Sequence, residues 1–348
     1  MTASLRHFML REIWEEGEAA RRTAESVSKS LKELTPSLSP TKFVYFTGSG
    51  TSYHASMVGQ YVMGRLAGVF SSPVPASEFR HWASPVSSET LVVAVSQSGE
   101  SVNTVDAARY AKERGAKVVA VTSTPESSLA ALSDHVLQTA AGEEKAVTAT
   151  KTYISQLVAI YLLSSSLGEA KGREEAGKVK GFFSRLPSQI DETVKSSSGQ
   201  VERLAEEFKG TEFFFILGTG PNYATALEGA LKLKEAANVF AEGFATREFL
   251  HGPMQLVDEK TPVMIIVPSR EHMGACVSLA HRFEKLKAPV VLLTDQEGWE
   301  RCILVPPVVE QILSPIFFVI PLQLFSYYLS VAKGLNPDNP EKLAKVVR

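Results

Sequence analysis

The chain contains the same short pattern twice, and this internal repeat restricts the fold more than any other feature of the sequence. The apolar run 43–46 leads into residues 47–53, and the run 213–217 leads into residues 218–223, with G-x-G-x-x-Y in both loops. Two more pairs of apolar runs follow in the same order, about 170 residues apart: 91–95 with 263–267, and 117–121 with 290–293. We interpret the pattern as a tandem duplication of one α/β unit.

Short apolar strands alternate with helical stretches in both copies. The strands are rich in β-branched residues and apolar on both faces, and helical patterns such as 102–114 and 275–285 follow them. This alternation predicts an α/β protein with two tandem doubly wound parallel sheets of flavodoxin-like type, each covered by helices on both faces. A helical segment over 168–210 separates the copies, and residues 8–27 predict an amphipathic helix before them.

Composition argues against several classes of protein. Lys and Arg number 36 against 38 for Asp and Glu, so there is no basic surplus for a nucleic acid backbone. Cys276 and Cys302 make neither a disulfide framework nor a CxxC pair, and the histidines lack metal-ligand spacing. Residues 1–10 do not read as a secretory signal, and prolines interrupt the apolar region 303–332. We expect a cytoplasmic protein that binds no nucleic acid, membrane or metal.

The loop after the first strand carries groups that suit a phosphate monoester. Gly48 and Gly50 let backbone N–H groups approach an anion at a helix N-terminus, and Thr51 and Ser52 add hydroxyl donors. A second hydroxyl-rich loop, residues 96–101, precedes the next helix of this copy. The second copy is poorer in such donors, so we assign the phosphate site to the first.

These loops also fit two alternative interpretations. Their serines and threonines are also the residues of ordinary helix N-caps. The G-x-G pattern also invites a dinucleotide interpretation, although Tyr53 and Tyr223 stand where that motif has its third glycine.

In the second copy, the expected helix 223–237 carries charges on a mostly apolar surface. Glu228, Lys232 and Glu235 fall at i, i+4 and i+7, on one narrow stripe. A helix that is apolar almost all round is buried, and buried charges need partners or a function. Burial raises a carboxylate pKa and suits it to proton transfer near neutral pH. The alternative is a solvated face with an i,i+4 ion pair.

These segments together resemble the sugar isomerase (SIS) family, and more closely the isomerase half of glucosamine-6-phosphate synthases. The resemblance rests on residues 50–53, 96–101, 150–151, 226–235 and 251–253, in the expected order, and on a C-terminal loop over 336–345. It implies an N-terminal helix over 1–34, a first SIS domain with the phosphate site over 35–180, a second with the catalytic helix over 195–338, and a catalytic loop over 339–348.

The resemblance also implies roles for single residues. Glu235 would move a proton between C1 and C2 of the open-chain sugar, and Lys232 would assist at a hydroxyl nearby. His251, beside Gly252-Pro253 in an expected tight turn, would open the ring in the neighbouring subunit of a homodimer. Lys345 would contact the open-chain carbonyl or form a Schiff base, and Glu144 would bind the amino group. The other implied substrate-binding residues are Thr51, Ser52, Ser96, Gln97, Ser98, Ser101, Glu228 and, through its backbone, Val147; no cofactor is implied.

The chain departs from the family pattern beside the expected amine pocket. Ala149 stands where the family usually has serine, and Lys145-Ala146 stands where it has an Ile-Gly pair. The family's synthases also carry a glutaminase domain with a cysteine nucleophile, whereas this sequence reaches its first expected strand by Phe43.

We therefore expect an isomerising deaminase that converts glucosamine 6-phosphate to fructose 6-phosphate and ammonia. The alternatives are a deaminase, deglycase or isomerase for another amino-sugar or glycated-amine phosphate, ammonia-dependent synthesis of glucosamine 6-phosphate, and, in another class, a non-catalytic sugar-phosphate sensor.

Overall fold

The structure is a computed structural model that describes residues 7–268, 270–308 and 310–345. The ends of the expected N-terminal helix and C-terminal loop, residues 1–6 and 346–348, lie outside this part. The chain forms two compact units, and each is described by itself. The first unit comprises residues 15–144, 149–187 and the chain from 344, and the second comprises the chain up to 14, residues 145–148 and 188–343.

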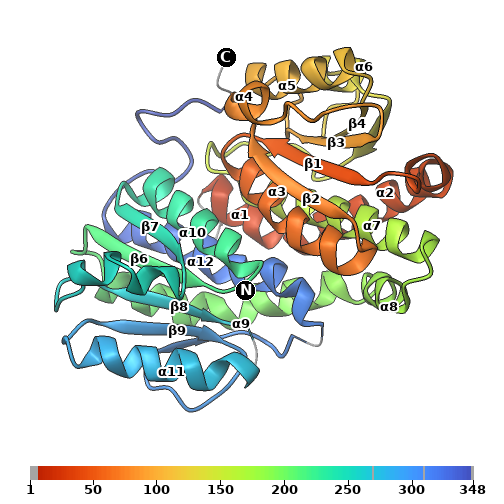
Figure 1. Ribbon diagram of the computed structural model, residues 1–348. Helices are drawn as coiled ribbons and strands as arrows, with labels where there is room; N and C mark the ends of the chain where they lie inside the picture. Colours follow the sequence, from red (N-terminus) through yellow and green to blue (C-terminus); the bar gives the residue numbers. More distant parts are fainter. Residues whose placement is uncertain (1–6, 269, 309, 346–348) are drawn as a thin grey trace. The chain divides into compact units, whose positions relative to one another are not determined.

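The first unit contains a parallel sheet of five strands in the order β2-β1-β3-β4-β5. Their bounds are Phe70–Pro75, Phe43–Gly48, Thr90–Val95, Lys117–Thr122 and His135–Gln138. The central strand β3 is buried along its whole length. Because the strand order reverses between β1 and β3, right-handed crossovers put α3 (Thr51–Val62) and α5 (Val102–Glu113) on opposite faces (Figure 1).

The second unit repeats this arrangement with the order β7-β6-β8-β9-β10. These strands span Phe240–Ala245, Phe213–Gly218, Val263–Val267, Val290–Thr294 and Cys302–Leu304. Here α10 (Asn222–Ala237) and α11 (Arg270–Glu284) cover opposite faces (Figure 1). The prediction of two doubly wound parallel α/β sheets is confirmed.

The remaining helices fill the space around the sheets. In the first unit, α7 (Lys151–Ala170) packs against α2 (Glu16–Leu38), α3 and α8 (Glu174–Phe182). In the second, α12 (Ser314–Ala332) packs against α10 and α1 (Phe8–Trp14). Residues 311–332 are long and apolar enough to cross a membrane, but 89% of the window that passes this test is buried inside the structure. The other helices are α9 (Leu186–Glu207), α4 (Phe79–Trp82), α6 (Ser128–Leu132), the π-helix Met63–Ala67 (η1) and short 3₁₀ turns (η2, Ala76–Glu78; η3, Glu248–Leu250; η4, Pro253–Leu256; η5, Gln311–Leu313).

The single helix expected over residues 8–27 is two helices. The first, α1, ends at Trp14, and α2 starts at Glu16. Their apolar faces are buried against different bodies, since α1 packs on α12 and α2 packs on α7. The break falls at Glu15, the residue at which the chain passes from the second unit to the first.

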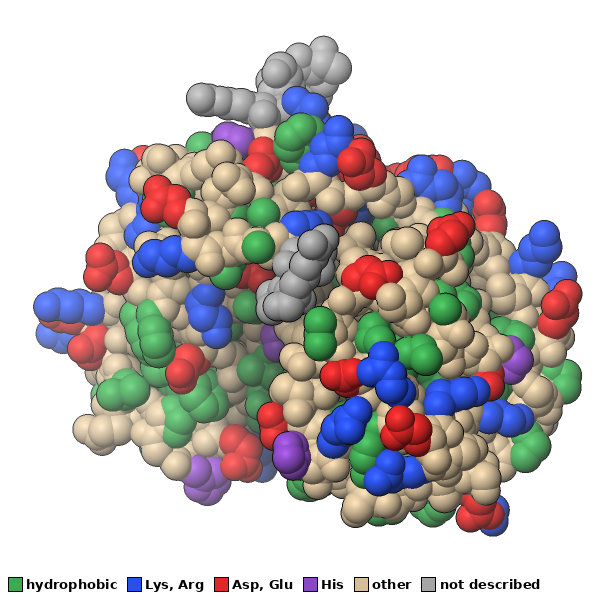
Figure 2. All heavy atoms as spheres, turned by 90° about the horizontal axis from the view of Figure 1, so that it is seen from above, with side chains coloured by type: hydrophobic (Ala, Val, Ile, Leu, Met, Phe, Trp, Pro, Cys, Tyr) green, Lys and Arg blue, Asp and Glu red, His purple; other side chains and the backbone are tan. Residues whose placement is uncertain are grey.

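Charged side chains of both signs share the molecular surface. On the face that Figure 2 shows, acidic and basic groups are interspersed, and neither sign forms a continuous patch there. This face therefore offers no extended field of one sign to a polyanion.

Candidate active site

The two hydroxyl-rich loops leave neighbouring strands of the first unit. Residues 48–52 begin at the last residue of β1 and extend into the first turn of α3, whereas residues 96–101 follow β3 and lead into α5. Because β1 and β3 are adjacent and parallel, both loops lie at the same edge of the sheet. We call these two loops the phosphate cradle. It contains Thr51, Ser52, Ser96, Gln97, Ser98 and Ser101.

Internal hydrogen bonds hold the 96–101 loop in one shape. The Ser96 hydroxyl accepts from the Gly99 amide at 3.1 Å, and the Gln97 carbonyl accepts from the Ser123 amide at 3.1 Å. Gly99 has a φ of +67°, and a Cβ at this position would lie 2.0 Å from the Ser127 hydroxyl, so only glycine fits. The loop therefore presents its side chains from a fixed backbone.

The cradle does not match the alternative in which its hydroxyls are ordinary N-caps. Gly50, with a φ of +54°, occupies the N-cap of α3, and the Ser101 side chain at the N-cap of α5 accepts no backbone amide. The Ser101 hydroxyl accepts instead from the Thr104 hydroxyl at 3.3 Å. A hydroxyl at a helix start that does not cap the helix is suited to binding an anion there.

A side chain that sequence reasoning missed supports the cradle. Gln156 on α7 is 1% exposed, and its Nε2 donates to Ser52 Oγ at 2.9 Å. The two residues lie 104 positions apart, so no local pattern relates them.

Glu144 lies buried at the N-terminus of α7. Its Oε1 accepts from the backbone amides of Thr150 at 2.9 Å and Thr152 at 3.1 Å, and its Oε2 lies 3.0 Å from Lys345 Nζ. Burial raises the pKa of Glu144, but the Lys345 ammonium and the amide donors outweigh burial and lower this pKa overall. The first unit thus brings together two predicted catalytic residues, a carboxylate and the cation beside it.

Val147 belongs to a short loop, residues 145–148, that packs with the second unit. Its amide donates to the Asp338 carbonyl at 2.9 Å, and the Glu12 carboxylate, 3% exposed, accepts from the two amides that precede Val147. The Val147 amide is therefore already bonded within the protein, so the predicted backbone contact to a sugar would have to use its carbonyl. Glu12 and Asp338 were not found from the sequence, although Glu12 stands among the apolar positions of α1.

The charged stripe lies on α10 in the second unit, as the sequence predicts. Glu228 and Lys232 are fully buried, with Lys232 Nζ 3.3 Å from Glu228 Oε1 and 2.5 Å from Glu235 Oε2. Burial lowers the pKa of Lys232, but the two carboxylates outweigh burial and raise it overall. Glu235 alone keeps part of its side chain, 21%, exposed. The solvated-face alternative is therefore wrong for Glu228 and Lys232.

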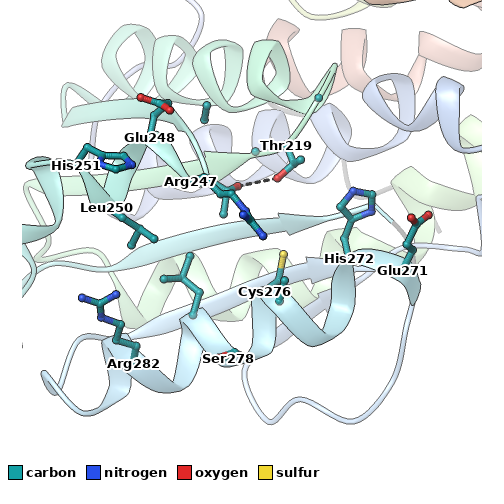
Figure 3. A pocket seen from close by; sticks show the side chains of 16 residues that line it. Thr219, Arg247, Glu248, Leu250, His251, Glu271, His272, Cys276, Ser278 and Arg282 are labelled. Atoms are coloured by element: carbon teal, nitrogen blue, oxygen red, sulfur yellow. Dashed lines mark hydrogen bonds between the residues drawn. The ribbon is translucent and has the colours of Figure 1, made fainter.

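His251 borders a cavity at the carboxyl ends of β6 and β7 (Figure 3). The cavity measures about 820 Å³, and α11 forms its other wall. His251 lies in the turn after η3, is exposed, and has no side-chain hydrogen bond or ion pair to any residue that the structure describes. The ring is thus presented rather than packed. The cavity also contains Arg247 and Arg282, which the sequence did not single out.

Comparison with known proteins gives a family match and similar chains. The model of the SIS domain matches residues 37–166 and 212–333. The isomerizing glutamine–fructose-6-phosphate aminotransferase of Gloeobacter violaceus is 39% identical over 98% of this chain, and that of Methanothermobacter thermautotrophicus is 37% identical over 98%. The chain spans 58% and 57% of the lengths of these two relatives.

Two solved structures are similar over nearly their whole lengths. The C-terminal domain of glucosamine-fructose-6-phosphate aminotransferase from Francisella tularensis has a TM-score of 0.89 and 29% identity, with 97% of this chain and 99% of that chain covered. Glucosamine-6-phosphate deaminase from Thermotoga maritima has a TM-score of 0.80 and 25% identity, with 98% and 99% covered.

Proposed function

This chain belongs to the SIS-domain family, is an enzyme of its sugar-phosphate isomerase type, and on that basis we propose that it catalyses isomerising deamination of glucosamine 6-phosphate. The observation that carries the proposal is the stripe on α10, in which a buried Lys232–Glu228 pair holds a partly exposed Glu235. A carboxylate fixed from one side and accessible from the other is suited to general acid–base catalysis. The likeness to a solved deaminase over 99% of that chain supports the same reaction.

The proposed reaction moves a proton from C2 to C1 of the sugar and releases ammonia. The phosphate cradle binds the phosphate of the substrate, and His251 promotes opening of the sugar ring. Glu235 then takes the proton from C2 of the open-chain amino aldehyde and returns it to C1. The aldehyde oxygen gains a proton and the amino nitrogen loses one, which leaves a hydroxyl at C1 and an imine at C2. Water adds to C2, the C–N bond breaks, and fructose 6-phosphate and ammonia leave.

In this scheme the other charged groups bind the substrate and orient the catalytic carboxylate. Lys232 holds Glu235 and assists at the adjacent hydroxyl, and Glu144, with Lys345 at 3.0 Å, forms the end of the site that receives the amine and the carbonyl. Because an ammonium substrate and Lys345 both suit the Glu144 carboxylate, substrate binding displaces or shares that ion pair in our proposal.

The names of the sequence relatives favour a second direction. They are aminotransferases that form an amino-sugar phosphate, so ammonia-dependent synthesis of glucosamine 6-phosphate from fructose 6-phosphate is the second candidate. The residues and the proton transfer are the same, run in reverse.

One experiment separates these functions. The protein is incubated with glucosamine 6-phosphate while ammonia and fructose 6-phosphate are measured, and separately with fructose 6-phosphate and ammonium. We expect equal amounts of ammonia and ketose in the first reaction. The proposal is wrong if neither mixture reacts, and if ligand binding without turnover is all that is found, the chain is a sensor.

Glu235→Gln tests the base. We expect turnover to fall by about two to four orders of magnitude, the usual contribution of a positioned acid or base, while phosphate binding is kept. Near-normal turnover would overturn this role of Glu235. Lys234→Gln, an exposed lysine on the same helix, is the matched control and is expected to retain activity.

Our proposal includes a homodimer in which His251 acts in the neighbouring subunit, and a cytoplasmic location. Light scattering of the purified protein tests the dimer. Mixing inactive Glu235→Gln and His251→Asn chains tests the shared site, since mixed dimers would regain activity only if the two residues act across subunits.

A further inference from the structure

The buried amide Gln156 has a polar environment that packing alone does not explain. It lies on α7, where every residue from Lys151 to Gly168 is buried. Its Nε2 bonds Ser52 Oγ, whereas its Oε1 has no hydrogen-bond partner within the part of the chain that the structure describes. A buried carbonyl without a partner is unfavourable, and leucine would fill a similar volume without that cost. The presence of an amide side chain at position 156 is therefore explained by its one hydrogen bond, to Ser52.

That bond decides what the Ser52 hydroxyl can do. Because Ser52 Oγ accepts from Gln156, its own proton remains for another acceptor, and Ser52 donates to none of the described residues. Ser52 is 9% exposed in the first turn of α3, beside the backbone amides of the cradle. The acceptor that this arrangement suits is an anionic oxygen.

The same helix also holds the opposite end of the expected ligand. Glu144 binds the amides of Thr150 and Thr152 at the N-terminus of α7, and Gln156 follows four residues after Thr152. Four residues are about one helical turn, a rise of about 6 Å. A rigid, buried helix thus fixes both the cradle serine and the carboxylate that pairs with Lys345.

We propose that Gln156 is a positioning residue for the phosphate subsite: its amide holds Ser52 Oγ so that the serine proton points to a phosphate oxygen of the ligand. This inference rests on the phosphate-binding part of the proposed function and not on the proton transfer. Gln156 touches Ser52 rather than the ligand, so it acts on binding and leaves the chemistry at C1 and C2 unchanged.

The test is a double-mutant cycle on the full-length chain, with inorganic phosphate as the probe in calorimetric titration. The variants are Gln156→Leu, Ser52→Ala and the combination. We expect Gln156→Leu to raise the Kd for phosphate about five- to tenfold, the worth of one neutral hydrogen bond. In the Ser52→Ala background the same change is expected to alter the Kd by less than about twofold, since the bond is already absent.

Two further variants separate positioning from folding. Ser56→Ala removes another buried hydroxyl of α3, which donates to the Ser52 carbonyl at 2.8 Å, and is the matched control. It is expected to lower the melting temperature without changing the Kd. Gln156→Glu keeps the shape of the side chain but accepts from the Ser52 hydroxyl, so we expect it to weaken phosphate binding at least as much as leucine does.

Steady-state kinetics distinguish a positioning role of Gln156 from a purely structural one. With a sugar phosphate that the enzyme turns over, Gln156→Leu should raise KM and leave kcat within about twofold. The inference is overturned if Gln156→Leu weakens phosphate binding equally with and without Ser52, if a folded Gln156→Leu chain binds phosphate normally, or if the unaltered protein binds no phosphate. Phosphate binding with the expected coupling but without turnover would support this inference and refute the proposed function.

Discussion

Replacing Lys232 with methionine tests whether the stripe on α10 is a buried ion pair. The ammonium lies 3.3 Å from Glu228 Oε1 and 2.5 Å from Glu235 Oε2, and both Lys232 and Glu228 are fully buried. Methionine fills the space of the lysine stem but leaves Glu228 without its ammonium. Breaking a buried pair from one side typically costs about 3–5 kcal/mol, and we expect a loss of that size.

The assay is denaturant unfolding followed by circular dichroism at several pH values. The raised pKa of Lys232 means that its contribution is fully present below its ordinary value of 10.5 and is lost only as pH rises through the higher folded-state value. The wild-type contribution should therefore be constant between about pH 6 and 9.

Two controls define the result that would refute this reasoning. Lys234→Met removes an exposed lysine from the same helix and should change stability by less than about 0.5 kcal/mol. Glu228→Gln combined with Lys232→Met removes both charges and should recover part of the loss. A loss below about 1 kcal/mol for Lys232→Met alone would mean that the stripe is solvated in the native protein.

Three further results are expected from the contacts in the two units. Glu144→Gln should destabilise the protein above pH 4.5, the ordinary pKa of this carboxyl. Because the pKa of Glu144 is lowered in the folded protein, the stability that the carboxylate contributes is lost as pH falls through the folded-state pKa. The acid unfolding curves of the wild-type and variant proteins should therefore converge at low pH. Ser98→Ala should raise KM for a sugar phosphate severalfold while kcat stays within about twofold, measured by steady-state kinetics; an equal drop in both would show that Ser98 acts in the chemical step. Glu12→Ala leaves two amides of the 145–148 loop without their acceptor and should cost about 1–3 kcal/mol in thermal unfolding, whereas Glu12→Gln should cost less.

The sequence predicted the central strands because burial on both faces leaves a continuous apolar run. The edge strands were missed because they lack that signal: β2 contains Pro73 and two serines, and β7 contains Glu242 and Gly243 among partly exposed positions. An edge strand pairs with a neighbouring strand along one edge only and is less buried than a central strand. Proline and polar residues are therefore tolerated in it, and no continuous apolar run results.

In the candidate site, too, some residues could be predicted from the sequence and others could not. The hydroxyl-rich loops and the charged stripe are local patterns, and the structure places each on the expected strand end or helix. Gln156, Glu12 and Asp338 escaped because each acts on a group more than a hundred positions away. Such contacts depend on how the chain folds back on itself, which composition and periodicity do not contain.

The route of the chain limits how this enzyme can be divided. The second unit consists mainly of residues 188–343. It also includes two earlier segments, the residues up to 14 and the loop 145–148. If the chain were divided near residue 187, the later fragment would therefore lack α1 and the Val147 loop. The earlier fragment would carry these segments with apolar surfaces exposed that are buried in the intact protein. We expect the halves to be soluble only when they are made together, so fragment complementation, rather than expression of isolated halves, is the way to study either one.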